Sequence, residues 1–226
     1  MIRKNSPFDG VFQKIPARLS ALLARIADLR WAFAAVFVSQ LLLSEWFLWN
    51  LLMVSQKYSM LDVLISQPIL FLEAGGWAFL IVLLAALFPL RWLRHTLAAL
   101  GVILSGFLAL GEALLLKAYD TVYNPEMCKS IVASDSRESA EFIASISHYW
   151  ELFLLMIGLV DLLSWGGILF LRRLRPITFA AVGVVCFFLG FGLSITRYRN
   201  WQWAYAPART TTNDRMAWGL LRAVRM

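Results

Sequence analysis

Acidic residues inside apolar blocks are the first chemically informative feature of this chain. Glu73 lies within the apolar block 69–90, and Glu112 lies within the block 96–118. Glu45 and Asp161 lie within the blocks 31–54 and 149–171. An ionised side chain in such a block is costly unless it is paired or hydrated. Glu73 and Glu112 share a similar depth, so together they could hold an ammonium group. Each carboxyl could equally be protonated, or hydrogen-bonded to a neighbouring helix without any role in binding.

A second candidate set lies in the longest polar loop. Ser130, Ser134 and Glu138 are spaced by four residues, so on a continuous helix they share one face. Two hydroxyls and a carboxylate could bind a phosphate-ester head group that bears an amine. The alternative is a solvated helix face, because the same loop carries residues typical of helix N-caps.

The elements that position these residues are long apolar segments. Of the 226 residues, 60% are hydrophobic and 15% are charged, whereas soluble domains carry about 25% charged residues. A block of roughly 20 apolar residues matches the thickness of the bilayer core. We therefore predict an all-α membrane protein with about five transmembrane helices, at residues 31–54, 69–90, 96–118, 149–171 and 177–195.

Orientation follows from the distribution of Lys and Arg. Six basic residues precede the first block, and the second and fourth loops are also basic, while the third loop is net acidic. Cytoplasmic loops carry the excess of Lys and Arg, which predicts a cytoplasmic N-terminus and an outer third loop. The arginine-rich tail fits four or six spans better, but the four loops agree with five. The expected organisation is a cytoplasmic basic amphipathic segment (1–30), a transmembrane domain (31–195) with an outer loop (119–148), and an outer connector tail (196–226).

Motifs of soluble catalytic sites are missing from the sequence. His95 and His148 fall on opposite sides of the predicted membrane, so they cannot share a metal. The sequence contains no HExxH, no CxxC, no Gly-rich phosphate loop and no GxSxG. The chain by itself therefore offers no hydrolase, kinase or zinc site, and we expect no nucleic-acid partner.

The outer loop resembles the N-terminal transmembrane domain of bacterial phosphoethanolamine transferases, which act on lipid A or core sugars and belong to the sulfatase type. In that family the loop after the third of five spans reads roughly as Asp, Met, an Ile–x–x–Thr–Asp segment and then Glu-Ala. The corresponding residues here are 124–127, 131–135 and 138–141. Span count and loop position are also similar, so the resemblance covers most of the chain.

The resemblance implies a membrane anchor for a periplasmic zinc enzyme. The family's catalytic domain uses a threonine nucleophile to move phosphoethanolamine from phosphatidylethanolamine to its acceptor. An Asn, a Thr and a Glu lie near the donor head group, and they fall here on Ser130, Ser134 and Glu138. Two of the three are substituted, while Glu138 matches. The implied location is the bacterial inner membrane, with the C-terminus in the periplasm.

The sequence departs from the family in one large respect. The catalytic domain should begin shortly after the tail, and the 226 residues contain neither the nucleophile nor the zinc ligands. We expect either an amino-terminal piece of a longer enzyme or a stand-alone remnant, so enzymatic activity stays open. No cofactor is expected in this chain, since zinc belongs to the catalytic domain.

The expected function is therefore an anchor that presents a phospholipid, most simply phosphatidylethanolamine. Glu138, with Glu73 and Glu112, would meet its ammonium group, and a periplasmic catalytic domain would be the protein partner. One alternative is a small transporter or channel in which Glu45, Glu112 and Asp161 form a proton or cation path. Another is a structural scaffold that docks a periplasmic partner through its basic tail.

Overall fold

Every regular secondary-structure element in the described part of the chain is an α-helix. The computed structural model describes residues 16–55, 60–119, 150–199 and 212–223, together with isolated residues between 129 and 144. The helices are α2 (Ala17–Asp28), α3 (Arg30–Ser55), α4 (Met60–Ala86), α5 (Arg91–Tyr119), α8 (Trp150–Arg172), α9 (Pro176–Arg199) and α11 (Thr212–Ala223). The all-α prediction is thus confirmed for these residues, and each of the five predicted blocks overlaps one helix.

Several helices are suited to a membrane. Among the described residues, four helices contain apolar stretches long enough to cross one, at Pro68–Ala86, Arg91–Ala113, Leu154–Arg172 and Pro176–Ile195. The chain is therefore a membrane protein with several transmembrane helices. The corresponding stretch of α3 is shorter, at Arg30–Leu42. A fifth crossing through α3 stays a prediction.

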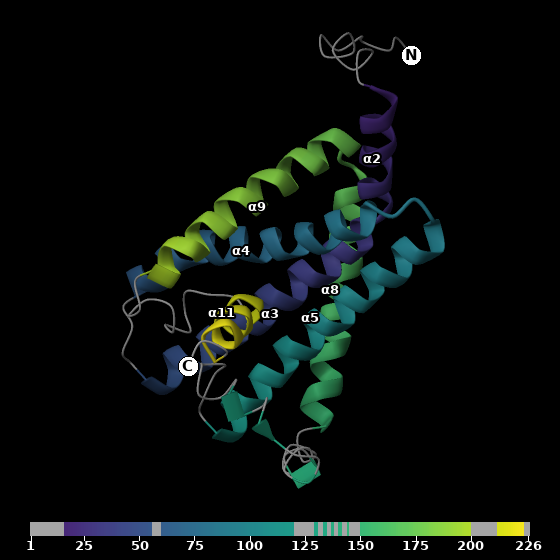
Figure 1. Cartoon of the computed structure of the whole chain (residues 1–226). Coiled ribbons are helices and arrows are strands. Elements are labelled where there is room, and N and C mark those ends of the chain that lie inside the picture. Colours follow the sequence, from purple (N-terminus) through teal and green to yellow (C-terminus); the bar gives the residue numbers. More distant parts are fainter. Residues whose placement is uncertain are drawn as a thin grey trace.

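Helix α3 lies in the middle of the bundle (Figure 1), where it contacts α4, α5 and α8. Helix α9 packs mainly against α4, on the side away from α5. The turns at residues 87–90 and 173–175 lie at the same end of the bundle as α2. We call this the arginine-rich end, and the opposite end, where α5 and α9 finish, the loop end.

Close contact between α4 and α9 depends on glycine. A Cβ atom added at Gly190 would lie 2.5 Å from the carbonyl oxygen of Leu72, and one added at Gly75 would lie 2.9 Å from Sγ of Cys186. Only a residue without a side chain fits at such a helix crossing. Small residues let membrane helices approach closely enough for extensive van der Waals contact, and among the described helices α4 and α9 have the most extensive contact.

The basic amphipathic segment predicted at 1–30 includes helix α2, while residues 1–15 lie outside the described part. Ile26 on α2 and the following Leu29 are buried, with exposed fractions of 3% and 0%. Helix α2 packs against α9 and α4 at the arginine-rich end. Its apolar face therefore contacts the bundle itself.

The predicted connector tail contributes a helix to the bundle. Helix α11 contacts α5 and α3, and Figure 1 shows it lying across these two helices near their loop ends. Its first residues, Thr212 and Asn213, are 1% and 6% exposed. The C-terminal segment is thus anchored in the interior, a feature that the sequence pattern did not reveal. Residues 200–211 lie outside the described part.

Candidate functional site

Two of the predicted site residues, Glu73 on α4 and Glu112 on α5, are buried. Their exposed fractions are 1% and 3%. Both have interaction partners within the molecule. Their burial on neighbouring helices makes them the only pair of predicted site residues that the described structure brings into the interior.

The relative depth of the two carboxyl groups follows from one close contact. A Cβ atom added at Gly101 on α5 would lie 2.5 Å from the side chain of Ile81 on α4. The two helices run in opposite directions, so eight residues back from Ile81 corresponds to eight residues forward from Gly101. Glu73 therefore lies level with Ala109. Glu112 is three residues further on, or about 4.5 Å along the axis. Both groups thus lie in the half of the bundle nearer the loop end.

Glu112 accepts a hydrogen bond from the tail helix. Oγ1 of Thr212 donates to Oε2 of Glu112 at 2.5 Å. A hydrogen bond to a carboxyl group in an apolar interior offsets part of the cost of burying it. Helix α11 therefore stabilises Glu112 and at the same time covers it.

A second set of hydrogen bonds lies beside this contact. The side-chain nitrogen of Asn213 donates to Oγ of Ser105 at 2.9 Å, and its backbone N–H donates to Oε1 of Gln40 at 3.2 Å. Nε2 of Gln40 donates to Oγ of Ser105 at 3.1 Å and to Oδ1 of Asn213 at 3.4 Å. The backbone bond satisfies an N–H of the first turn of α11, which has no partner within its own helix. We call the group Gln40, Ser105, Glu112, Thr212 and Asn213 the buried polar cluster.

Four members of the buried polar cluster were missed in the sequence. Gln40 and Ser105 are uncharged polar residues within apolar blocks, and such residues often bond across membrane helices. The run from Thr210 to Asp214 has the composition of a helix N-terminus. These signals could have identified each residue as a candidate on its own. The contact between Gln40 and Asn213 could not be predicted, because 173 residues separate them in the chain.

The loop hydroxyls form one helical turn. The backbone N–H and Oγ of Ser134 both donate to the carbonyl oxygen of Ser130, each at 2.8 Å. The two serines therefore lie on one face, as their spacing indicated. The hydroxyl hydrogen of Ser134 is already donated to the backbone, so binding a phosphate requires it to rotate. Glu138 lies outside the described residues, so its place on this face stays a prediction.

Two acids of the alternative ion path have described side chains, and Glu112 is buried whereas Asp161 is not. Asp161 is exposed, and it lies about 140° around α8 from Met156. Met156 packs beside Ala109 of α5, near the buried Glu112. The side chain of Glu45 lies outside the described part of the chain.

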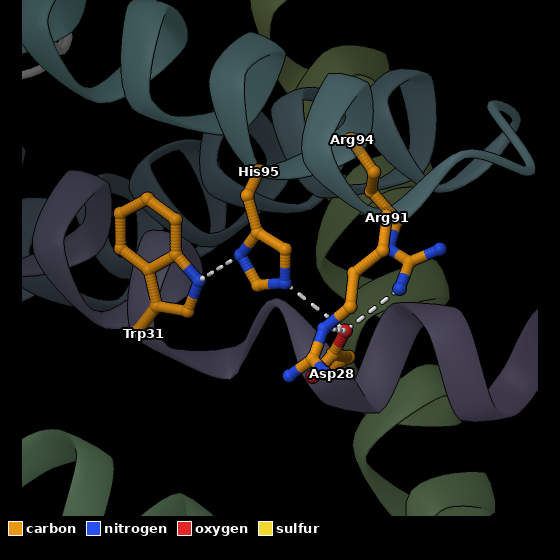
Figure 2. Close-up of polar contacts among 5 residues, drawn as sticks. All are labelled: Asp28, Trp31, Arg91, Arg94 and His95. Carbon is orange, nitrogen blue, oxygen red and sulfur yellow. Dashed lines mark hydrogen bonds and ion pairs between the residues drawn. The ribbon is translucent and has the colours of Figure 1, made fainter.

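A separate polar group holds the arginine-rich end together (Figure 2). Oδ2 of Asp28 accepts from Nη2 of Arg94 at 2.7 Å and contacts Nε2 of His95 at 3.1 Å. Nε1 of Trp31 donates to Nδ1 of His95 at 3.3 Å. Because Trp31 is only a donor, Nδ1 must accept, which leaves the proton on Nε2 to be donated to Asp28. Nε of Arg91 lies 3.9 Å from the same carboxylate oxygen.

The pKa of Asp28 is lowered by these neighbours. Partial burial of the carboxyl by itself raises its pKa, but the hydrogen bonds from Arg94 and His95 and the positive charge of Arg91 outweigh this effect. The carboxylate thus links α2 to the start of α5. This is a structural role, since every partner is a residue of the bundle.

Metal chemistry has no visible basis in the described residues, where no three His, Cys, Asp or Glu side chains are grouped closely enough to hold an ion.

Comparison of the chain with protein-family models, curated proteins and solved structures gave no match. The class of protein therefore follows from the fold alone, which is a helical membrane bundle with acidic residues in its interior.

Proposed function

We propose that this chain is the membrane anchor and phospholipid-presenting domain of a phosphoethanolamine transferase-like protein. The ligand is a phospholipid with an ammonium head group, most simply phosphatidylethanolamine. The observation that carries the proposal is the burial of Glu73 and Glu112 at similar depth on adjacent helices. Two acidic side chains in an apolar interior favour a cationic ligand.

Binding would use both carboxyl groups without dismantling the buried polar cluster. A carboxylate offers about four lone-pair sites, so an ammonium group can approach Glu112 beside the hydroxyl of Thr212. Ser130 and Ser134 supply hydroxyls on one face of a helical turn. In this proposal they meet the phosphate, together with Glu138.

The proposed location is the bacterial inner membrane, with a cytoplasmic N-terminus, five crossings and a periplasmic tail. The charge distribution supports this orientation, because cytoplasmic ends of membrane helices carry the excess of basic residues. The arginine-rich end holds Arg91, Arg94, Arg172, Arg173 and Arg175. The loop end, where α11 docks, would then face the periplasm and a catalytic domain there.

Native mass spectrometry of the purified chain with defined lipids tests the proposal. Phosphatidylethanolamine should bind in preference to phosphatidylglycerol, and Glu73→Gln and Glu112→Gln should each reduce that preference. Glu141→Gln is the matched control, since Glu141 is an exposed acid paired only with Arg137 among the described residues. Equal binding of both lipids, or an unchanged preference in both variants, would remove the lipid-presenting role.

The transferase part of the proposal has its own test. Sequencing the source gene past codon 226 should reveal a continuing reading frame that encodes a threonine nucleophile and Asp/His zinc ligands. A stop codon at that point would overturn the link to a catalytic domain encoded by the same gene. The lipid-binding experiment would be unaffected by that result.

A further inference from the structure

Helix α8 has one face against the bundle. A Cβ atom added at Gly167 would lie 3.5 Å from Cβ of Ala34 on α3. Met156 and Ser164 are also buried, with exposed fractions of 3% and 6%, and α8 packs mainly on α3. At about 100° per residue, these three residues define a single inner face.

The opposite face of α8 is exposed over its whole length. Leu162, Trp165 and Leu169 are 66%, 67% and 46% exposed. Gly158 lies at the centre of this face, and a Cβ atom added there would meet no atom within 4 Å. Asp161 lies on the same face, within about 60° of Gly158. We call these five residues the outer face of α8.

Asp161 is at membrane depth. The apolar stretch of α8 runs from Leu154 to Arg172, which places Asp161 about 10 Å from one end and about 16 Å from the other. No hydrogen bond or ion pair joins its side chain to any other residue that the structure describes. Acidic side chains at this depth pair with another polar group or face a hydrated cavity, so an exposed one indicates a partner outside the chain.

A second copy of this chain is a poor partner for Asp161. The basic residues of the described long helices lie near helix ends, where they cannot reach the middle of the bilayer. They are Arg30, Arg91, Arg94, His95, Lys117, Arg172, Arg197 and Arg199. Two copies meeting through the outer face of α8 would bring one carboxyl group against another. Two carboxylates cannot both stay ionised side by side in an apolar medium, whereas a cation on another helix would balance the charge of Asp161 directly.

We propose that the outer face of α8 docks a transmembrane helix of another membrane protein, one that carries a Lys or Arg near the middle of its span. The cation would pair with Asp161, and the open surface at Gly158 would let the helix backbone approach closely. Trp165 and the leucines would supply apolar contact on either side. This inference rests on α8 alone and is independent of the lipid proposal.

Fluorescence energy transfer in lipid vesicles tests this pairing. The whole chain is labelled and mixed with labelled polyleucine transmembrane peptides of one length, which contain either a single central Lys or only Leu. We expect the Lys peptide to bind on the order of tenfold more tightly. Asp161→Leu should abolish the difference, and Gly158→Ile should weaken binding of the Lys peptide.

Leu104→Ala on α5 is the control, because Leu104 is 61% exposed on a different helix and should leave binding unchanged. Thermal unfolding of Asp161→Leu checks that the bundle is intact. Equal affinity for the two peptides would overturn the proposal, as would Lys-peptide binding that survives Asp161→Leu. Self-association of the chain that depends on Asp161 would also overturn it, in favour of a second copy.

Discussion

The hydroxyl of Thr212 donates a hydrogen bond of 2.5 Å to the carboxyl group of Glu112, although 100 residues separate them in the chain. This contact joins the tail helix α11 to the interior of the membrane bundle, in the half nearer the loop end. It also gives a buried acid a partner that belongs to a different part of the sequence. The tail and the interior of the bundle should therefore respond together to mutation.

Thr212→Val should loosen helix α11. The variant keeps the shape of the side chain but removes the hydrogen bond that Thr212 donates to Oε2 of Glu112, and the loss of a hydrogen bond to a buried group costs about 1–3 kcal/mol. Thermal unfolding in detergent should occur at a lower temperature, and trypsin should cleave the tail faster. Thr178→Val is the matched control, because Thr178 is exposed on α9. Equal effects of the two variants would contradict the role assigned to Thr212.

Gln40 and Asn213 should be energetically coupled. Gln40→Leu removes the partners of the backbone N–H and of Oδ1 of Asn213, so it should reduce the free energy of unfolding by about 1–3 kcal/mol. Asn213→Leu keeps the backbone N–H but removes the side-chain bonds to Gln40 and Ser105, so it should also be destabilising. The double variant should lose less than the sum of the two single losses. Chemical denaturation of the four proteins in detergent measures the coupling. Strict additivity would show that the two side chains act independently.

Acid should weaken the arginine-rich end through Asp28. Because the pKa of Asp28 is lowered from 3.8 in the folded state, the unfolded chain binds more protons in the interval below 3.8. The contribution of Asp28 is therefore complete above that interval and is lost as the pH falls through the folded-state pKa. Asp28→Asn should be less stable than the parent at neutral pH and should approach it in acid.

Thermal unfolding across this pH range measures the effect. Glu151→Gln is a suitable control, since Glu151 is exposed at the opposite end of the bundle. A stability difference between Asp28→Asn and the parent that stays constant with pH would exclude the carboxylate as its source.

Two glycines of α9 should respond in opposite ways to alanine. At Gly190 the new methyl group would meet the carbonyl oxygen of Leu72 at 2.5 Å, so the helices must separate, at a cost of about 1–3 kcal/mol. At Gly192 no atom lies within 4 Å, and alanine should be neutral or stabilise the helix by up to about 1 kcal/mol. Unfolding temperatures in detergent compare the two, and a tolerant Gly190 would contradict the close approach.

The helices were largely readable from the sequence because apolar blocks of membrane length leave few alternatives to a helix. The predicted segments 31–54 and 149–171 differ by one residue at each end from α3 and α8. The second differs more, since α4 begins at Met60 rather than at residue 69. Hydropathy finds the apolar part of a helix, whereas the hydrogen-bonded helix continues through polar residues and here through Pro68.

The candidate site was readable only in part. Glu73 and Glu112 stood out because acids are rare in apolar blocks, and the predicted span boundaries already placed them at a similar depth. Their surroundings could not be derived, because Thr212 reaches Glu112 only after the chain has crossed the bundle and returned. Likewise, nothing in the α8 sequence distinguishes Asp161 as exposed, whereas Glu112 is buried.

The sequence by itself determined the class of this protein, the positions of its helical segments and which few acidic residues lie within them. These properties are local, since they follow from runs of apolar residues and from the need to satisfy every backbone hydrogen bond in lipid. Only the tertiary structure decided which acids are enclosed and which face outward, and which residues serve as their partners. That outcome depends on helix rotation and on contacts between distant segments, which are fixed by packing at positions such as Gly190 and by the buried polar cluster.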